Sequence, residues 1–254
     1  MAINWQNWEV FCKSTTESAL VPRCWGHDGD ITYLQWMFHA WGWTLSVALC
    51  AWVIAVLIGG LVGTARTLPN SPWLVRLANA WVELFRNIPI LVQLFLWYFV
   101  LPKLFPPMQK IPGFVLVVFA LGFFTSARIA EQVRAGIQAL SRGQRYAGMA
   151  VGFTTAQTYR YVLLPMAVRI ILPPLTSESM SLLKNSSVAF AVSIAELTMF
   201  AMQAQEETSR GIEIYLAVTG LYALSAFAVN RIFAIIEKKV RIPGFIVAGG
   251  TGGH

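Results

Sequence analysis

Charged side chains are scarce in this sequence. Asp, Glu, Lys and Arg make up 12% of its 254 residues, whereas a soluble globular domain carries about 25%. A chain with so little charge cannot cover a water-exposed surface. Hydrophobic residues make up 56%, the mean hydropathy is +0.59, and ten tryptophans are present, a residue that favours the membrane–water interface. The composition therefore predicts an integral membrane protein.

Motifs of common enzyme classes are missing as well. There is no H-E-x-x-H zinc motif, no Walker-type glycine loop for ATP, and no cysteine pair at metal-ligand spacing. We therefore expect no catalytic site, no metal site and no cofactor in this chain. The net charge of +7 is spread along the sequence, which argues against a nucleic-acid partner and fits positively charged cytoplasmic loops.

Cysteine is rare too, with three in the chain. Cys50 lies in an apolar run and is expected to be a small core residue. Cys12 and Cys24 lie in a polar N-terminal stretch, and two free thiols or a disulfide are equally compatible with the sequence, a disulfide requiring an oxidising compartment. Residues 1–35 show no basic start followed by an apolar core, so we expect no cleavable signal peptide.

Long uncharged runs predict about five spanning helices, since each span needs roughly 20 mostly apolar residues. The first lies between His39 and Arg66 and contains Gly59 and Gly63 at a spacing that lets two helices approach closely. Pro89 is expected to bend the start of the second. The later spans are predicted at about 88–102, 111–127 and beyond, 162–195 and 214–230.

Two polar stretches separate these spans. Residues 131–161 carry several arginines and are predicted to form a helical segment too charged to cross a membrane, and residues 202–213 are predicted to form a polar loop. With five spans, the segments rich in Lys and Arg fall on one side, which is the cytoplasm by the positive-inside rule. The N-terminus and the 202–213 loop are then periplasmic, and the C-terminus is cytoplasmic.

The predicted topology divides the chain into three parts. Residues 1–36 form a periplasmic segment, residues 37–240 a transmembrane domain with a cytoplasmic loop at about 134–161, and residues 241–254 a flexible tail. A cytoplasmic insert of helix, glycine and helix suits the docking of a soluble partner. The alternative is a loop that lies on the lipid headgroups.

The residues of this insert resemble a known docking loop. The run Gly143-Gln144-Arg145-Tyr146-Ala147-Gly148-Met149-Ala150-Val151-Gly152, followed by Val162-Leu163-Leu164-Pro165, resembles the "EAA" loop of permease subunits of ATP-binding cassette (ABC) importers. That loop has E-A-A, a glycine three residues later and I-x-L-P about nine residues further on. Tyr146 stands in place of the glutamate and Gly148 in place of the second alanine, whereas Gly152 and Pro165 keep the pattern.

Three further stretches resemble the polar amino-acid family of these permeases. They are E-L-F-R-N-I-P-I-L-V-Q at 83–93, S-A-R-I-A-E-Q-V-R-A-G-I at 126–137 and L-K-N-S-S at 183–187, in family order and with family spacing. The resemblance covers about residues 38–240. The F-T-S-A-R and K-N-S variants are most similar to glutamate/aspartate import permeases.

This resemblance implies an all-α type I importer permease in the bacterial inner membrane. A separate ABC ATPase dimer would bind ATP, a periplasmic binding protein would deliver the amino acid, and a second permease subunit, expected to be a paralogue, would complete the path. The coupling helix that docks into the ATPase would be formed by Gly143, Gln144, Tyr146, Ala147, Gly148 and Gly152, with Pro165 following. Gly152 would allow the tight turn after it.

Charged residues at membrane depth are functional candidates because they are costly to bury there. Related permeases more often carry an uncharged residue in place of Arg128 and an acid in place of Asn185. Compared with those permeases, this chain has gained a cation at Arg128 and lost an anion at Asn185. Both differences suit a cavity for an acidic amino acid, since a guanidinium binds a carboxylate through two hydrogen bonds. Lys184 and Ser126 are the other candidates for the substrate path.

The residues leave other interpretations open. Arg128 could instead pair between helices, for instance with Glu83 or Glu131, and Glu178 could be the structural partner of some cation. Glu83 and Arg86 are three residues apart and are expected to pair on one helix face. A small channel or secondary carrier working alone is the alternative function, but it would leave the polar segment without a role and no inverted repeat is visible.

Overall fold

The computed structural model describes residues 5–16, 20, 24–25 and 31–240, so the predicted tail at 241–254 lies outside it. The described residues divide into two compact units. The first holds residues up to Ala51, Ile90–Leu121 and Leu182–Phe227, and the second holds Trp52–Pro89, Gly122–Ser181 and the residues from Ala228 on. Each unit is described separately below.

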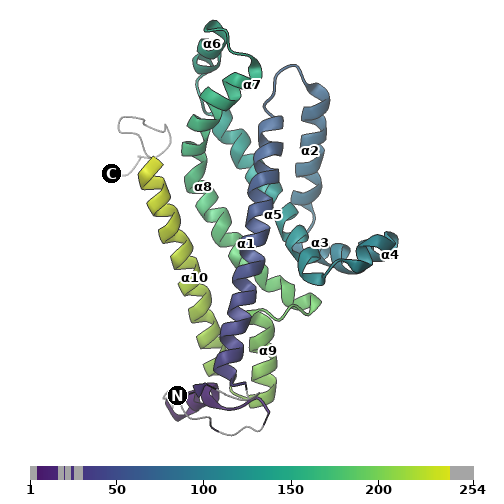
Figure 1. Cartoon of the computed structure of the whole chain (residues 1–254), viewed down its shortest axis with the longest axis vertical. Helices are drawn as coiled ribbons and strands as arrows, with labels where there is room; N and C mark the ends of the chain where they lie inside the picture. The colour runs from purple at the N-terminus through teal and green to yellow at the C-terminus, as the bar shows by residue number, and fades with distance from the viewer. Residues whose placement is uncertain (1–4, 17–19, 21–23, 26–30, 241–254) are drawn as a thin grey trace. The chain divides into compact units, whose positions relative to one another are not determined.

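Helices account for nearly all regular structure in the described residues, where the only β pairing consists of two isolated bridges. In chain order (Figure 1) they are η1 (Trp5–Cys12), α1 (Tyr33–Ala65), α2 (Pro72–Asn87), α3 (Ile90–Phe95), η3 (Leu96–Val100), α4 (Leu101–Leu104), η4 (Pro106–Lys110), α5 (Gly113–Gln138), α6 (Arg142–Ala150), α7 (Thr155–Thr158), η5 (Tyr159–Leu163), α8 (Leu164–Asn185), η6 (Ser186–Val192), α9 (Leu197–Thr208) and α10 (Gly211–Val240).

Among the described residues, three helices, α1, α5 and α10, are long and apolar enough to cross a membrane. Five spans result if each of two bent helix pairs counts as one, namely Pro72–Asn87 with Ile90–Leu104 and Thr155–Val192 with Leu197–Thr208. This agrees with the predicted all-α membrane fold of about five spans. The break between α2 and α3 falls at Ile88 and Pro89, where Ile88 is extended, as expected for a residue before proline.

Two predicted boundaries are corrected. α5 continues to Gln138, so residues 131–138 are part of the third spanning helix and not of the polar insert. Ion pairs compensate the charges in this last part of α5 and so allow it to stay helical. The predicted loop at 202–213 is wrong, because α9 runs to Thr208 and α10 begins at Gly211.

The core of the second unit forms around the last part of α5. A Cβ on Gly59 would lie 2.8 Å from the side chain of Ile129, and one on Gly63 would lie 2.6 Å from the carbonyl oxygen of Ala130. The prediction that these two glycines allow a close helix approach is therefore confirmed, and the helix approached is α5. On another side of α5, Gly136 lies against Ile171 of α8 in the same way.

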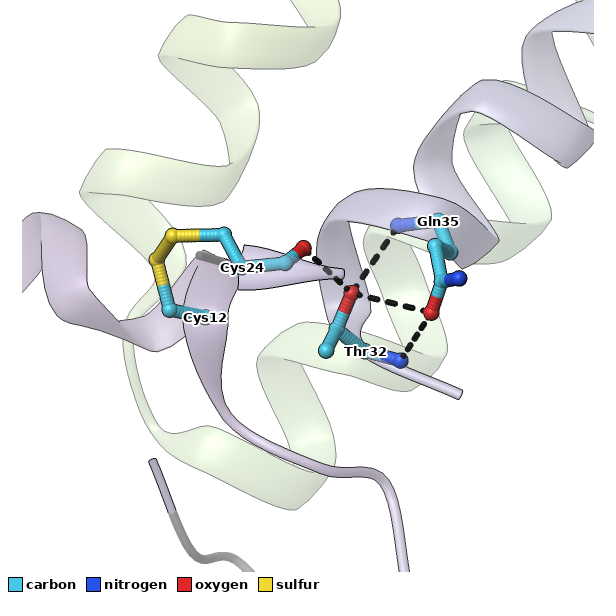
Figure 2. Close-up of a disulfide and its surroundings, with 4 residues drawn as sticks. All are labelled: Cys12, Cys24, Thr32 and Gln35. Atoms are coloured by element: carbon cyan, nitrogen blue, oxygen red, sulfur yellow. Dashed lines mark hydrogen bonds between the residues drawn. A yellow bond between two sulfur atoms is a disulfide. The ribbon is translucent and has the colours of Figure 1, made fainter. Parts of the chain in front are cut away.

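The first unit has its own core, which joins η1 to α9 and to the early parts of α1 and α10. Its buried members are listed here: Val10, Phe11, Tyr33, Met37, Ala40, Leu197, Phe200, Ala201, Ala204, Ile214 and Val218. The Tyr33 hydroxyl donates a hydrogen bond of 2.8 Å to Glu207 of α9. Cys12 and Cys24 form a disulfide in this unit (Figure 2), which decides between the two possibilities left open by the sequence.

Candidate functional site

An ion pair between α5 and α8 is the first candidate site. The Arg128 guanidinium binds the Glu178 carboxylate through two hydrogen bonds, from Nε to Oε2 at 2.8 Å and from Nη2 to Oε1 at 3.1 Å. The partner of Arg128 is therefore Glu178, not Glu83 or Glu131. Sequence analysis did suggest that Glu178 pairs with a cation, but 50 residues separate the two partners, so spacing gave no way to identify which one.

The two members of this pair differ in exposure. The Arg128 side chain is 43% exposed, whereas that of Glu178 is 11% exposed. Arg128 lies ten residues before the end of α5, which is about 15 Å along a helix and close to half the thickness of a bilayer core. A nearly buried carboxylate thus holds a guanidinium that is partly exposed.

Ser179, the residue after Glu178, connects α8 to α1. The indole N–H of Trp52 in α1 donates to the Ser179 hydroxyl at 2.8 Å, and Ser179 in turn donates to the carbonyl of Leu175. Trp52 also packs edge-on against Phe233 of α10. These contacts tie the part of α8 that carries Glu178 to α1.

The other predicted substrate-path residues are placed differently. Ser126 is fully buried, accepts a 3.1 Å hydrogen bond from the Trp81 indole and donates to the carbonyl of Phe123, so it takes part in the contact between α2 and α5. Lys184 and Asn185 are the last two residues of α8 and belong to the first unit, whereas Arg128 and Glu178 belong to the second. Lys184 is exposed and Asn185 is half-buried.

A second ionic group lies around Glu131, one turn after Arg128. Glu131 Oε1 lies 3.0 Å from Arg66 Nη1 and 3.3 Å from Arg86 Nη1, and Oε2 lies 3.0 Å from Arg134 Nη2. Three arginines from α2, α5 and the residue after α1 thus share one carboxylate. We call this group the Glu131 clasp. Arg66 also donates to Asn79 of α2 at 2.7 Å.

The clasp corrects the predicted pairing of Glu83 with Arg86. Arg86 contacts Glu131 instead, and Glu83 is exposed. A pair three residues apart on one exposed helix face gains only a few tenths of a kcal/mol. Glu131 is already held in place by Arg66 and Arg134, and Arg86 of α2 pairs with this carboxylate of α5 and not with Glu83.

The predicted coupling segment folds as two short helices joined by a tight turn. α6 ends in a Schellman motif: the Gly152 N–H donates to the Met149 carbonyl at 3.0 Å and the Phe153 N–H to the Gly148 carbonyl at 3.1 Å. Gly152 has φ +87°, a conformation that glycine adopts without steric cost. The predicted tight turn at Gly152 is confirmed.

The two helices pack closely against each other at one end of the second unit (Figure 1). A Cβ on the buried Gly148 would lie 3.0 Å from Thr158 Cγ2, so α6 crosses α7 at a glycine. Thr154 and Gln157 form a capping box at the start of α7. The Tyr159 hydroxyl donates to the Thr67 carbonyl at 2.5 Å and so ties the segment to the turn after α1.

The outer face of this segment is apolar and basic. Tyr146 is 63% exposed, Met149 52% and Val151 72%, and Arg142 is exposed nearby on α6. Of the remaining predicted coupling residues, Gly143, Gln144 and Ala147 lie on α6 and Pro165 is the second residue of α8. No acidic residue occurs between Gln138 and Arg169 in the sequence. The segment thus presents a fixed, exposed surface suited to a protein partner.

One polar residue of the first unit was missed by sequence analysis. Glu196 is fully buried, and its carboxylate caps α9 by accepting hydrogen bonds from the backbone N–H groups of Thr198 and Met199. The Tyr222 hydroxyl of α10 donates to it at 2.9 Å. An acid directly before an apolar helix was the available signal, but Glu is not among the residues that usually cap helices.

Comparison with known proteins shows to which family this chain is similar. Residues 53–242 match the family described as "Binding-protein-dependent transport system inner membrane component". The chain is 39% identical to the glutamate/aspartate import permease protein GltJ of Escherichia coli (strain K12), over 96% of this chain and 98% of that protein. It is 32% identical to the glutamine transport system permease protein GlnP of the same strain, over 78% of this chain and 90% of that protein.

Solved structures agree with these sequence relatives. The chain of an amino acid ABC transporter structure superposes with a TM-score of 0.71 at 32% identity, covering 82% of this chain and 95% of that one. An inward-facing methionine ABC transporter, MetNI, shares the fold at 21% identity, with a TM-score of 0.69 over 82% of this chain and 98% of that one. The sequence match over three quarters of the chain and the shared fold place this protein in the family of inner membrane permease components of binding-protein-dependent ABC transport systems.

Proposed function

We propose that this chain is the permease subunit of an ABC importer for an acidic amino acid, glutamate or aspartate, and that Arg128 binds a carboxylate of the substrate. The observation that carries the proposal is the pair described above, a half-exposed guanidinium at membrane depth held by a nearly buried carboxylate. The identity of 39% to a glutamate/aspartate import permease over almost the whole chain supports the substrate class.

Glu178 is the partner of Arg128 when no substrate is bound. A guanidinium at membrane depth without a counter-ion is costly, so in the absence of substrate Glu178 neutralises Arg128. Nε and Nη2 are used in this pair, and the remaining N–H groups of Arg128 are left to bind an incoming carboxylate. An acidic substrate brings one more negative charge than a neutral amino acid, and Arg128 favours it for that reason.

The segment from α6 to α7 is the proposed docking site for the ATPase. Its exposed Tyr146, Met149 and Val151 would enter a cleft of a separate ABC ATPase dimer, which binds and hydrolyses ATP. The Schellman turn and the contact of Gly148 with Thr158 make the segment rigid. Closure of the ATPase would therefore move α8 and the rest of the second unit as one body.

The proposal includes the orientation and the partners. The N-terminus is periplasmic, where a binding protein delivers the amino acid, and the C-terminus is cytoplasmic. The disulfide between Cys12 and Cys24 supports this orientation, because disulfides persist in the periplasm and not in the cytosol. The second permease subunit is a paralogue of this chain.

Uptake by the assembled transporter in proteoliposomes tests the role of Arg128. In Arg128→Ala we expect glutamate uptake to fall about 10- to 100-fold, which corresponds to the loss of one hydrogen-bonded charge pair of about 1.5–3 kcal/mol. Arg128→Lys should recover only part of the rate, because an ammonium cannot bind a carboxylate bidentately.

The double variant Arg128→Ala/Glu178→Gln separates transport from folding. It removes both charges, so no unpaired carboxylate remains and the complex should assemble normally. We expect glutamate uptake to stay low in this variant while the relative uptake of glutamine rises. Glutamate uptake and selectivity equal to those of the unsubstituted transporter would contradict the proposal.

A further inference from the structure

Two stretches of backbone connect the segment from α6 to α7 with the Arg128–Glu178 pair. We call this segment, residues 142–158, the docking segment. On one side, residues 139–141 join it to the end of α5, which carries Arg128, and these three residues are not helical. On the other side, α7 passes through η5 into α8, which carries Glu178. A movement of the docking segment reaches the pair through these two connections or through side-chain contacts.

The connection through α8 is weakened by two prolines. Pro173 and Pro174 lie inside this helix, between the docking segment and Glu178. Proline has no backbone N–H, so the hydrogen bonds that would join these residues to the carbonyls of Arg169 and Ile170 cannot form. The missing bonds make this the place where α8 bends most easily. The part of α8 with Glu178 can therefore lag behind the part that follows the docking segment.

A side-chain contact joins the end of the docking segment to α1. The hydroxyl of Tyr159, the first residue of η5, donates to the Thr67 carbonyl at 2.5 Å and to the Thr67 hydroxyl at 3.1 Å. Tyr159 is 5% exposed and packs in one core with Ile137 and Leu163, which holds its hydroxyl against Thr67. The backbone N–H and the hydroxyl of Thr67 both donate to the Thr64 carbonyl, so Thr67 is tied to the last turn of α1.

From this turn, α1 leads to α8 again on the far side of the prolines. The Trp52 indole of α1 donates to Ser179 at 2.8 Å, and Ser179 directly follows Glu178. Between Trp52 and Thr67 the chain contains no proline, and α1 packs closely against α5 at two glycines. α1 thus spans the weak point of α8 and contacts both helices that carry the pair.

We infer that Tyr159 is a positioning residue for transport, because its hydrogen bond to Thr67 makes α1 a second connection that carries the movement of the docking segment past the proline pair to Arg128 and Glu178. The inference rests on the proposed function and names the contact on which the proposed movement of the second unit as one body depends. Without this contact, the docking segment follows the ATPase while Glu178 lags behind. ATP is then hydrolysed with less transport.

The test measures glutamate uptake and ATP hydrolysis in parallel, with the complete transporter and its binding protein in proteoliposomes. Tyr159→Phe removes the hydroxyl and keeps the buried ring. We expect ATP hydrolysis to stay within about twofold of that of the unsubstituted transporter, while the glutamate transported per ATP falls about 2- to 10-fold, the change that loss of one neutral hydrogen bond makes in a conformational equilibrium. A merely structural hydroxyl would lower uptake and hydrolysis together, and an unchanged ratio would overturn the inference.

Tyr161→Phe is the matched control. It removes the same group two residues later, from a side chain that is 59% exposed and whose hydroxyl forms no hydrogen bond within the described residues. The glutamate transported per ATP should be unchanged in this variant. Thr67→Val removes only the hydroxyl acceptor and leaves the carbonyl, so it should lower the ratio less than Tyr159→Phe does.

The proline pair gives a second, independent readout. In Pro173→Ala/Pro174→Ala both residues can donate to the carbonyls one turn earlier, so α8 becomes continuous and depends less on the connection through α1. Tyr159→Phe introduced into this background should therefore lower the glutamate transported per ATP clearly less than it does in the unsubstituted chain. An equal fall in both backgrounds would mean that the hydroxyl does not act by bypassing the prolines, and would overturn the inference.

The outcomes separate this inference from the proposed function. If the unsubstituted transporter hydrolyses ATP but takes up no glutamate, the proposed substrate class is wrong. If it takes up glutamate and Tyr159→Phe, assembled at normal levels, transports the same amount per ATP, the role of Tyr159 is wrong and the proposed function stands.

Discussion

Two carboxylates on neighbouring helices of the second unit, Glu131 and Glu178, serve arginines in different ways. Glu131 faces three guanidiniums and uses both oxygens for them, so the clasp keeps two positive charges in excess. Glu178 faces one guanidinium and balances it. The clasp joins three segments of the chain, whereas the Arg128–Glu178 pair joins two.

This difference fits a structural role for the clasp and the substrate-binding role that we propose for Arg128. In the clasp the most buried member is a cation, Arg66, whose side chain is 11% exposed, so the positive charge is fixed in the interior and depends on its carboxylate. In the pair the less exposed member is the anion, at 11%, and the cation is 43% exposed. Arg128 is the one cation of its pair and is 43% exposed, whereas the exposed cation of the clasp, Arg86 at 58%, shares its carboxylate with two other arginines.

The largest effect is expected from Glu131→Gln. This change leaves the guanidiniums of Arg66, Arg86 and Arg134 without their shared carboxylate. Only Arg66 is nearly buried, so the cost should approach but not exceed the about 3–5 kcal/mol of breaking a fully buried ion pair. We expect little folded permease in the membrane and a thermal midpoint of the purified complex well below that of the unsubstituted protein.

Glu83→Gln is the control for this change, because Glu83 is exposed on α2 and has no ion pair within the described residues. It should leave expression and the thermal midpoint unchanged. Normal amounts of stable complex in Glu131→Gln would show that the clasp is not needed for folding, and the contrast with Glu178 would then fail.

Gly63→Ala disturbs the clasp indirectly, by changing the distance between α1 and α5. We expect an intermediate loss of stability. The added Cβ would lie 2.6 Å from the Ala130 carbonyl oxygen and from Val133, so α1 must move away from α5 and take Arg66 with it. Overpacking of this kind costs about 1–3 kcal/mol. Thermal unfolding of the complex should detect the loss, while Arg128 and Glu178, on α5 and α8, should keep their substrate selectivity.

Gly60→Ala provides the comparison within the same helix. Nothing lies within 4 Å of the Cβ that it would add, so the substitution should be neutral or should stabilise α1 by up to about 1 kcal/mol. Equal destabilisation by both alanines would mean that the contact of α1 with α5 is looser than the distances indicate.

Much of this architecture could be predicted from local sequence. The spans follow from long uncharged runs, the close approach of some helix to α1 from the spacing of Gly59 and Gly63, and the turn after α6 from Gly152. Each of these features depends on residues within a few turns of one another. The end of α5 was misjudged because its charges suggested exposure, and their compensation by Arg66 and Arg86 comes from other segments.

The candidate site was predictable only in part. A lone arginine in an apolar run identifies Arg128 as a candidate, because a charge at that depth needs a reason. Its partner could not be found in the same way, since Glu178 is 50 residues away and both Glu83 and Glu131 were available. Tertiary packing determines which carboxylate pairs with Arg128. Three other arginines bind Glu131, and the packing of α8 against α5 places Glu178 beside Arg128.

The smallest effect is expected from Arg86→Ala, which removes the most exposed member of the clasp. The Arg86 side chain is 58% exposed, and ion pairs of exposed groups contribute about 0–1 kcal/mol. Arg66→Ala should cost clearly more, because Arg66 is 11% exposed and also donates to Asn79. Thermal midpoints of the two purified variants give the ranking. Equal losses would mean that Arg66 and Arg86 contribute alike and that burial does not set the strength of the clasp; the predicted order would mean that Glu131 chiefly stabilises Arg66, the least exposed cation of the clasp.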